Sequence, residues 1–418
     1  MSIPRLHLPL APSEIAAFLA RLALPDGFGR GVVEEFERRF AALFDRHHAI
    51  AFCRARSALY HLLQCLDLPP GSDVAISGLH VADFVNMIRL AGFRPVVVDL
   101  EADSYSIDMA DLAAKTGAKT SCLLVTPLSG HSPDLARLAA FAKERQLVLI
   151  EDCSQAFSTE FQGRRAGSFG RAAIYSLSLL KSVSTMRGGV VTTDDAHLAE
   201  RLRGRAAKAG KASRLSLAGE AIKQAVIALA TWRPLFSLVV LPLLRVTSGL
   251  NDLFSRFQKS NRTVSLRASM PKAFLEAFSW PQAALGLGQL ASFERREKRR
   301  IDLAVALRGA ILPARGFSLP RLTEGSRNCW WLFPLLTDHP AALKAHLARH
   351  GIDSAPMLLS ALASEEAFLA MGFKAPNAER LKARTLFVPL HEAMSGDDVE
   401  RVAAALLAFQ SPTAPKGP

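Results

Sequence analysis

Cysteine is scarce in this sequence, with five residues in a chain of 418, at positions 53, 65, 122, 153 and 329. Their spacing matches neither a zinc site nor a disulfide scaffold, so we expect reduced thiols and no bound metal. We interpret Cys153 as a small core residue. Any chemistry is therefore expected from other residue types.

Long apolar runs are also missing. Residues 1–10 are too short and too interrupted by proline for a signal peptide. Residues 225–231 and 235–244 are apolar, but Arg233, Pro234 and Pro242 break them well short of the roughly eighteen residues that a spanning helix needs. We therefore expect a cytoplasmic protein, and any membrane contact would be peripheral, at the inner face of the membrane.

Acidic residues are rare in one part of the chain. Of a net charge of +13, nearly all comes from residues 201–275, which contain 14 Lys and Arg but two acids, Glu220 and Asp252. Such a segment favours phosphate-bearing partners or an anionic membrane surface. No nucleic-acid partner is expected.

The first half of the chain has the pattern of an α/β protein. Between about residues 32 and 195, short runs rich in Val and Ile alternate with helical periodicity, which is typical of a mainly parallel sheet. The pattern predicts strands at 73–77, 94–99, 121–126, 147–151, 172–176 and 189–193, and helices at 57–66, 81–91 and 135–145.

The second half changes character. Residues from about 209 to 272 break the alternation and are interpreted as an apolar, basic insertion. A long helix over 282–309, a strand over 332–336 and a helix over 397–409 are predicted after it. We expect a large domain over residues 1–300 and a smaller α+β domain over residues 301–418.

Asp152 follows a predicted buried strand, at the carboxyl end where open α/β sheets bind ligands. Burying that charge without a partner would cost several kcal/mol, so a cation is expected beside it. A protonated pyridine nitrogen would meet this need, because the carboxylate keeps the ring able to accept electrons. A helix N-cap or a structural ion pair is the alternative.

Lys181 lies in a largely apolar run between a strand that ends in Ser176 and a Gly188-Gly189 turn. Apolar surroundings lower the pKa of a lysine and supply the free amine that imine chemistry requires. Ser176 and Ser178 offer hydroxyl groups to a phosphate. The alternative is a surface lysine whose stem lies along apolar neighbours.

The order of these pieces resembles the DegT family of pyridoxal-phosphate (PLP) dependent sugar aminotransferases. The resemblance implies the type I aminotransferase fold, with a large α/β domain around a mainly parallel sheet and a smaller C-terminal α+β domain. It covers both predicted domains and leaves out the insertion. The motifs that carry it are 151–155, 163–170, Tyr175-Ser176, Lys181 and Gly188-Gly189, with further matches at 36–40, 57–59, 95–99, Tyr105, 282–287, 333–334, 351–352 and 389–391.

The resemblance also implies roles for single residues. Lys181 would be the catalytic residue and bind PLP as an imine, and Asp152 would pair with the pyridinium nitrogen. Gln155 would lie near the ring hydroxyl, and Ser176 would bind the phosphate. At the start of the helix that contains Ser57, where the turn reads Arg54-Ala55-Arg56-Ser57, the N–H groups of Ala55 and Arg56 would face the phosphate.

Three positions depart from the family pattern. Arg56 replaces a usual hydroxyl and either contacts the phosphate or points to solvent. An aromatic side chain normally covers the PLP ring, whereas here His80 or Val81 is left for that task. An Asn-containing motif that reaches the phosphate of a neighbouring subunit is replaced by residues 274–280.

The resemblance implies amino transfer from an amino acid, glutamate being expected, to a keto sugar carried by a nucleotide or a lipid, in glycan or polysaccharide biosynthesis. A homodimer is implied. One alternative is a PLP-dependent sugar dehydratase, against which the retained Lys181 argues, because the family's dehydratases have histidine there. The other is a non-catalytic, membrane-associated scaffold or regulator.

The insertion has two interpretations. A helical hairpin that dips into one membrane leaflet would place its basic flanks at anionic headgroups. A helix pair that covers the enzyme or forms a dimer contact would also hide its apolar residues. The basic residues around it are Lys208, Lys211, Arg214, Lys223, Arg245, Arg256, Lys259 and Arg262.

Overall fold

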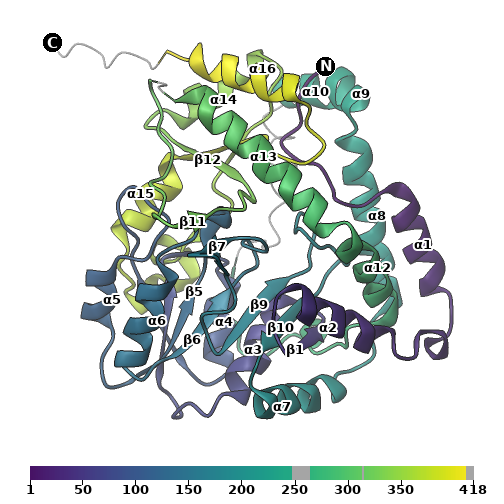
Figure 1. Ribbon diagram of the computed structural model, residues 1–418, viewed down its shortest axis with the longest axis vertical. Helices are drawn as coiled ribbons and strands as arrows, with labels where there is room; N and C mark the ends of the chain where they lie inside the picture. The colour runs from purple at the N-terminus through teal and green to yellow at the C-terminus, as the bar shows by residue number, and fades with distance from the viewer. Residues whose placement is uncertain (247–263, 313–314, 411–418) are drawn as a thin grey trace.

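A seven-stranded sheet forms the centre of the large domain in the computed structural model, which describes residues 1–246, 264–312 and 315–410 (Figure 1). All of its strands are parallel except β10, which pairs antiparallel with both neighbours. The predicted α/β class with a mainly parallel sheet is confirmed. The strand order is β1 (His48–Phe52), β10 (Gly189–Thr193), β9 (Ala172–Ser176), β6 (Val148–Asp152), β5 (Thr120–Val125), β2 (Asp73–Ser77) and β4 (Arg94–Val98).

Six of these strands lie within a residue of their predicted bounds, and β1 was missed. Strand β1 lies at the edge of the sheet, and Ile50 is its one β-branched residue. The sequence signal for a strand is therefore weak there, and pairing with β10 decides the conformation.

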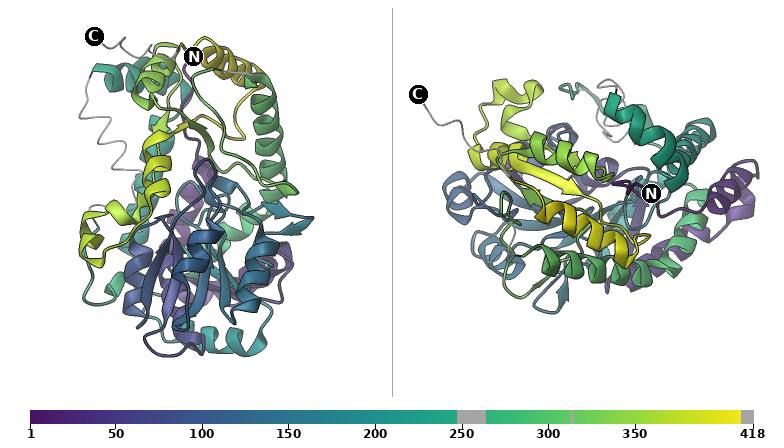
Figure 2. Two further views of the ribbon diagram at one scale, coloured as in Figure 1. Left: turned by 90° about the vertical axis from the view of Figure 1, so that its left-hand side faces the viewer. Right: turned by 90° about the horizontal axis from the view of Figure 1, so that it is seen from above.

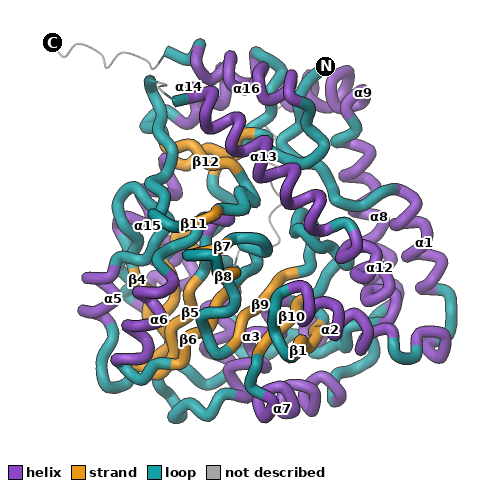
Figure 3. Tube along the Cα trace, in the orientation of Figure 1, coloured by secondary structure: helices purple, strands orange, loops and turns teal. Residues whose placement is uncertain are grey.

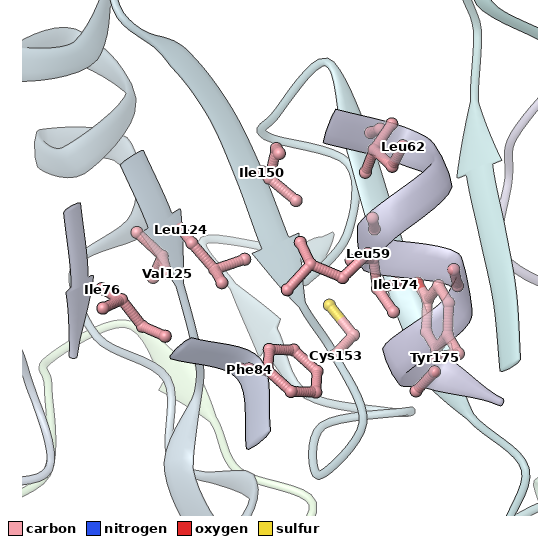
Figure 4. Packing of buried hydrophobic residues seen from close by; sticks show 14 of the residues in the cluster. Leu59, Leu62, Ile76, Phe84, Leu124, Val125, Ile150, Cys153, Ile174 and Tyr175 are labelled. Carbon is pink, nitrogen blue, oxygen red and sulfur yellow. The ribbon is translucent and has the colours of Figure 1, made fainter. Parts of the chain in front are cut away.

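Helices surround the sheet (Figure 3). Their apolar faces and the strands form one large core, in which Leu59 and Leu62 pack near Ile150 and Ile174 (Figure 4). Cys153 is fully buried in this core, as predicted, and burial raises the pKa of its thiol. The helices are α2 (Val32–Leu43), α3 (Ala55–Cys65), α4 (Asp83–Leu90), α5 (Met109–Lys115), α6 (Leu135–Glu144) and α7 (Ala196–Ala207).

A second core belongs to the C-terminal part. It includes residues of a three-stranded sheet, and Ile3 from the N-terminal segment packs in it as well. The elements are β12 (Phe333–Leu336), β15 (Thr385–Val388), β13 (Ala355–Pro356), α14 (Pro340–Arg349), α15 (Pro376–Arg384) and α16 (Gly396–Leu407). Shorter strand pairings involve β7 (Glu160–Phe161), β8 (Arg164–Arg165), β11 (Ser326–Arg327), β3 (Leu79–His80) and β14 (Ser360–Ala361).

The prediction of one long helix over 282–309 was wrong. The chain forms α12 (Trp280–Ala291) and α13 (Phe293–Ile311), and Ser292 separates them with φ −106° and ψ 0°. The periodic pattern continues through the break, so the sequence does not reveal it. Phe293 packs in the first core and Ile311 in the second, and the predicted domain boundary at residue 300 falls within α13.

The predicted insertion forms a bent helical arm. Helix α8 (Arg214–Ala230) packs against α1 (Pro12–Leu22), and α9 (Arg233–Leu235), a π-helical turn (Phe236–Val240) and α10 (Leu241–Val246) follow. Among the described residues, no single helix is long and apolar enough to cross a membrane; α8 and residues 233–243 pass that test together but meet at a 63° bend. The flanking Arg256, Lys259 and Arg262 lie outside the described residues.

Candidate active site

The predicted site residues meet at one edge of the sheet. Asp152 ends β6 and Ser176 ends β9, which are neighbouring parallel strands. Thr126 follows β5, and His80 lies in β3 directly after β2. Because carboxyl ends of adjacent parallel strands share one edge, the fold brings together side chains that are up to a hundred residues apart in sequence.

Asp152 is almost fully buried in a small polar network. Its Oδ1 accepts a hydrogen bond from the N–H of Ser154 at 3.1 Å, and its Oδ2 lies 3.4 Å from His80 Nε2. His80 Nδ1 accepts the N–H of Val81 at 2.9 Å, so its Nε2 carries the proton and lies 2.9 Å from Thr126 Oγ1.

The imidazole of His80 is held neutral. Burial lowers the pKa of His80, although the charge of Asp152 opposes the shift. A neutral imidazole does not neutralise Asp152, so the positive charge beside this carboxylate must come from the Lys181 amine or from a bound cation. The prediction that His80 or Val81 covers a cofactor ring stays a prediction.

Lys181 lies in the loop after β9, with its Nζ 3.7 Å from the centroid of the Trp331 indole ring. Burial lowers the pKa of Lys181 to about 8, against the raising effect of the negative charge on Asp152. A substantial fraction of the amine is therefore neutral slightly above neutral pH. Trp331 was not predicted; its one sequence signal is the Trp330-Trp331 pair in a chain with four tryptophans.

The loop that carries Lys181 is held in a strained conformation. Leu180 and Met186 have φ angles of +71° and +68°, a region that costs bulky side chains about 1 kcal/mol or more each. Trp331 Nε1 donates to the carbonyl of Leu180 at 2.7 Å. The amides of Gln282 and Gln224 donate to the carbonyls of Arg187, at 2.5 Å, and Met186, at 3.0 Å.

These contacts give Gln282 of the family motif a role and identify Gln224 as a further residue that supports the loop. Gln282 belongs to the stretch that resembles the family, and it fixes the loop beyond Lys181. Gln224 lies in the arm helix α8 and is fully buried. The arm therefore supports the lysine loop, which the sequence did not predict.

Gln155 and Glu151 belong to one motif but have different partners. Gln155 Oε1 accepts the N–H of Ser129 at 2.8 Å, which leaves the Nε2 hydrogens as donors for a ring hydroxyl. Glu151 is fully buried and accepts the N–H groups of Gly167, Phe169 and Gly170, each at 2.7 Å. Burial raises the pKa of Glu151, and those hydrogen bonds oppose the shift. Its role is to hold the glycine loop.

The N-terminus of α3 lies beside the end of β9. In the sheet, Gly189 pairs with Ser176 on one side and with Phe52 on the other. A Cβ atom at Gly189 would lie 2.4 Å from the nitrogen of Ala55, so a glycine is required for α3 to begin here. The N–H groups at this helix start and the Ser176 hydroxyl form a cradle suited to phosphate.

Guanidinium groups surround this cradle. Arg54 and Arg56 lie over the ring of Phe274, and Arg56 Nη1 pairs with Asp83 Oδ2 at 3.0 Å, so Arg56 does not simply point to solvent. Burial, together with the charges of Arg56 and Arg187, lowers the pKa of Arg54. Within the described part of the chain, the buried Nε of Arg54 has no hydrogen-bond partner.

These residues fit PLP. A buried carboxylate that calls for a cation, a lysine with a lowered pKa, and a cradle with an unpartnered arginine nitrogen match its pyridine nitrogen, aldehyde and phosphate. Arg54 would then add to the predicted set of Ala55, Arg56 and Ser176 at the phosphate.

Comparison with known proteins decides the family. The sequence model of the DegT/DnrJ/EryC1/StrS aminotransferase family matches residues 29–223 and 278–407. The chain belongs to this family. It is therefore a PLP-dependent aminotransferase of the sugar aminotransferase type, and the predicted resemblance is confirmed. The match stops inside α8 and resumes just before α12, so most of the arm lies outside it.

Two relatives from bacteria are similar to this aminotransferase in sequence. It is 28% identical over 384 residues to the spore coat polysaccharide biosynthesis protein SpsC of Bacillus subtilis, covering 90% of this chain and 88% of that protein. It is 30% identical over 169 residues to GDP-perosamine synthase of Escherichia coli O157:H7, covering 40% of this chain and 46% of that protein.

Solved structures confirm the fold. The sugar aminotransferase CalS13 from Micromonospora echinospora has a TM-score of 0.75 at 19% identity, over 98% of this chain and all of that one. GDP-4-keto-6-deoxymannose-3-dehydratase has a TM-score of 0.72 at 17% identity, over 97% of this chain and all of that one. Aminotransferases and a dehydratase share this fold, so residues must distinguish the reactions.

The lowered pKa of Lys181 can be measured directly. In competitive labelling of the protein with trace acetic anhydride, the reactivity of Lys181 should rise through a midpoint of about pH 8, because the neutral amine is the nucleophile. Exposed lysines should show midpoints near the ordinary value of about 10.4. A midpoint for Lys181 equal to theirs would contradict its desolvation.

The phosphate cradle depends on Gly189. Replacement Gly189→Ala should destabilise the protein by about 1–3 kcal/mol and weaken PLP binding, because its Cβ forces α3 away from the sheet. The control is Gly204→Ala in helix α7, where no atom lies within 4 Å and alanine should stabilise by up to about 1 kcal/mol. Urea unfolding and PLP titration measure both effects; equal behaviour of the two variants would refute the close contact.

Proposed function

We propose that the enzyme transfers an amino group from an amino acid, most simply glutamate, to a keto sugar carried by a nucleotide or a lipid, in polysaccharide biosynthesis. The observation that carries the proposal is the lowered pKa of Lys181 in the field of Asp152. The names of the two relatives, a coat polysaccharide protein and a GDP-perosamine synthase, support the substrate class.

When bound, PLP supplies an electron sink at the donor's α-carbon. Lys181 Nζ would hold the cofactor and, when free, would carry the proton that leaves the donor's α-carbon. Asp152 maintains the positive charge on the pyridine nitrogen. The neutral His80 donates its Nε2 hydrogen to Thr126 Oγ1, and the same nitrogen lies 3.4 Å from the carboxylate.

The cavity beside Lys181 has a lining of mixed charge, in which Glu392 lies among several basic side chains. It measures about 40 Å³, and the lining includes Arg5, His7 and Arg296 with Trp331. Burial lowers the pKa of Arg296, so this cation gains from a carboxylate or phosphate partner. A larger cavity, of about 770 Å³, lies along the edge strand β4 and is lined by other residues, so size alone does not mark the reaction site.

The alternatives have less support. A dehydratase of this family has histidine in place of the lysine, whereas Lys181 is retained. A non-catalytic scaffold has no need for a desolvated lysine on a strained loop that three side chains hold. We further propose a cytoplasmic homodimer, by analogy with the family.

Lysine replacement tests the function. Lys181→Ala should abolish amino transfer, because it removes the amine that binds PLP and moves the proton, while the fold should persist. Wild-type protein with PLP should be yellow and lose its colour on borohydride addition, and candidate amino acids should convert it in a half-reaction that candidate keto sugars reverse. The control is Lys298→Ala, an exposed lysine of α13 paired with Asp302. Undiminished turnover by Lys181→Ala would overturn the proposal.

A further inference from the structure

The arm helix α8 is apolar on two opposite sides. Leu217 and Ala221 are buried against α1 and its neighbours, and Ile227 on the same side is also buried. At about 100° per residue, the opposite side presents a second apolar stripe to solvent. That stripe consists of Leu215, which is 88% exposed, and Ile222, Val226 and Leu229, each more than half exposed.

The exposed stripe continues beyond the bend. Trp232 is 60% exposed and Leu238 is 78% exposed, and Val239 and Leu243 also face solvent. Phe236 and Leu241 of the same segment are buried in a small cluster of their own. The apolar exposure therefore spans both helical segments, and such a contiguous patch marks an interaction site.

The arm is anchored at three points along its length. The amide of Gln224 reaches the lysine loop, and Arg233 pairs with Asp398 at the start of α16. The N–H of Ser2 donates to Ser237 Oγ at 2.8 Å. As a result, α8 runs along the outer side of the molecule beside α1, and α9 and α10 lie near the N-terminus (Figures 1 and 2). The apolar face is thus presented outward on a fixed support.

The charge around the arm indicates which kind of partner it binds. Lys208 and Lys211 are exposed just before α8, and Lys223 lies within it. Glu220 is the one acidic residue of α8, and its negative charge opposes the lowering of the pKa of Arg54 in the phosphate cradle. A second copy docked symmetrically through this face would bring two positively charged surfaces together. An anionic bilayer complements them instead, and a tryptophan beside the bend is typical of the lipid–water interface.

We propose that the arm, residues 208–243, docks this enzyme on an anionic membrane surface. The stripe from Leu215 to Leu243 inserts into the headgroup region, and the neighbouring lysines contact anionic lipids. The 63° bend and the anchoring contacts keep the arm in the plane of the surface. Docking does not depend on the identity of the substrate, but it places amino transfer next to lipid-linked intermediates and membrane enzymes.

Vesicle cosedimentation tests the proposal with the full-length protein. Wild type should pellet with phosphatidylcholine vesicles that contain phosphatidylglycerol, bind pure phosphatidylcholine much more weakly, and dissociate as salt is raised. The variant Ile222→Ser/Val226→Ser/Leu229→Ser should lose binding by about tenfold for each side chain that inserts fully. Lys208→Glu/Lys211→Glu should lose the preference for phosphatidylglycerol.

A matched control changes exposed apolar residues elsewhere. Val305→Ser/Leu369→Ser/Leu407→Ser replaces side chains that are 61%, 60% and 51% exposed, and it should bind vesicles as wild type does. The arm variants should keep their amino-transfer activity without vesicles, which shows that they fold. Two results would overturn the proposal: negligible binding of wild type to anionic vesicles, or arm variants that dissociate from dimer to monomer in sedimentation velocity, which would make the arm a contact between copies.

Discussion

The site depends on the interaction between the amine of Lys181 and the carboxylate of Asp152, in a place from which most water is removed. Desolvation lowers the pKa of the lysine, and the negative charge limits the shift, so the amine titrates at about pH 8. Without the charge of Asp152, burial would lower the pKa of the amine further. Without burial, the amine would stay charged near neutral pH. Both conditions come from the fold: β6 supplies the carboxylate, and Trp331 covers the lysine.

Holding that lysine requires a loop conformation that the chain would not adopt alone. Leu180 and Met186 lie in the left-handed region, and Trp331, Gln282 and Gln224 hold the carbonyls around them. The three side chains come from distant segments, which makes the loop a product of tertiary structure. Since Gln224 belongs to α8, the arm that is apolar on its outer side is also part of the support for the catalytic loop.

Much of the fold and part of the site could be predicted from local patterns. Strands such as β6 and β9 are short, largely apolar runs that end in polar side chains, so Asp152 and Ser176 stand out in the sequence itself. The edge strand β1 and the break at Ser292 carry no such pattern. Trp331 and Gln224 acquire their roles through contacts that span 151 and 38 residues, and Arg54 through burial of an Nε that has no hydrogen-bond partner among the described residues, so no spacing rule reveals them. Arg56 shows the same limit, because its partner Asp83 is recognisable only in three dimensions.

The role of Asp152 is the central claim, and the single-turnover rate of Asp152→Asn tests it most directly. With PLP bound and glutamate added, a neutral amide cannot maintain the positive charge on the pyridine nitrogen, although it fills the same space. The rate should fall by at least about tenfold, or ~1.4 kcal/mol of barrier, while the cofactor stays bound. A wild-type rate in this variant would contradict the assignment of Asp152 and, with it, the account of the site.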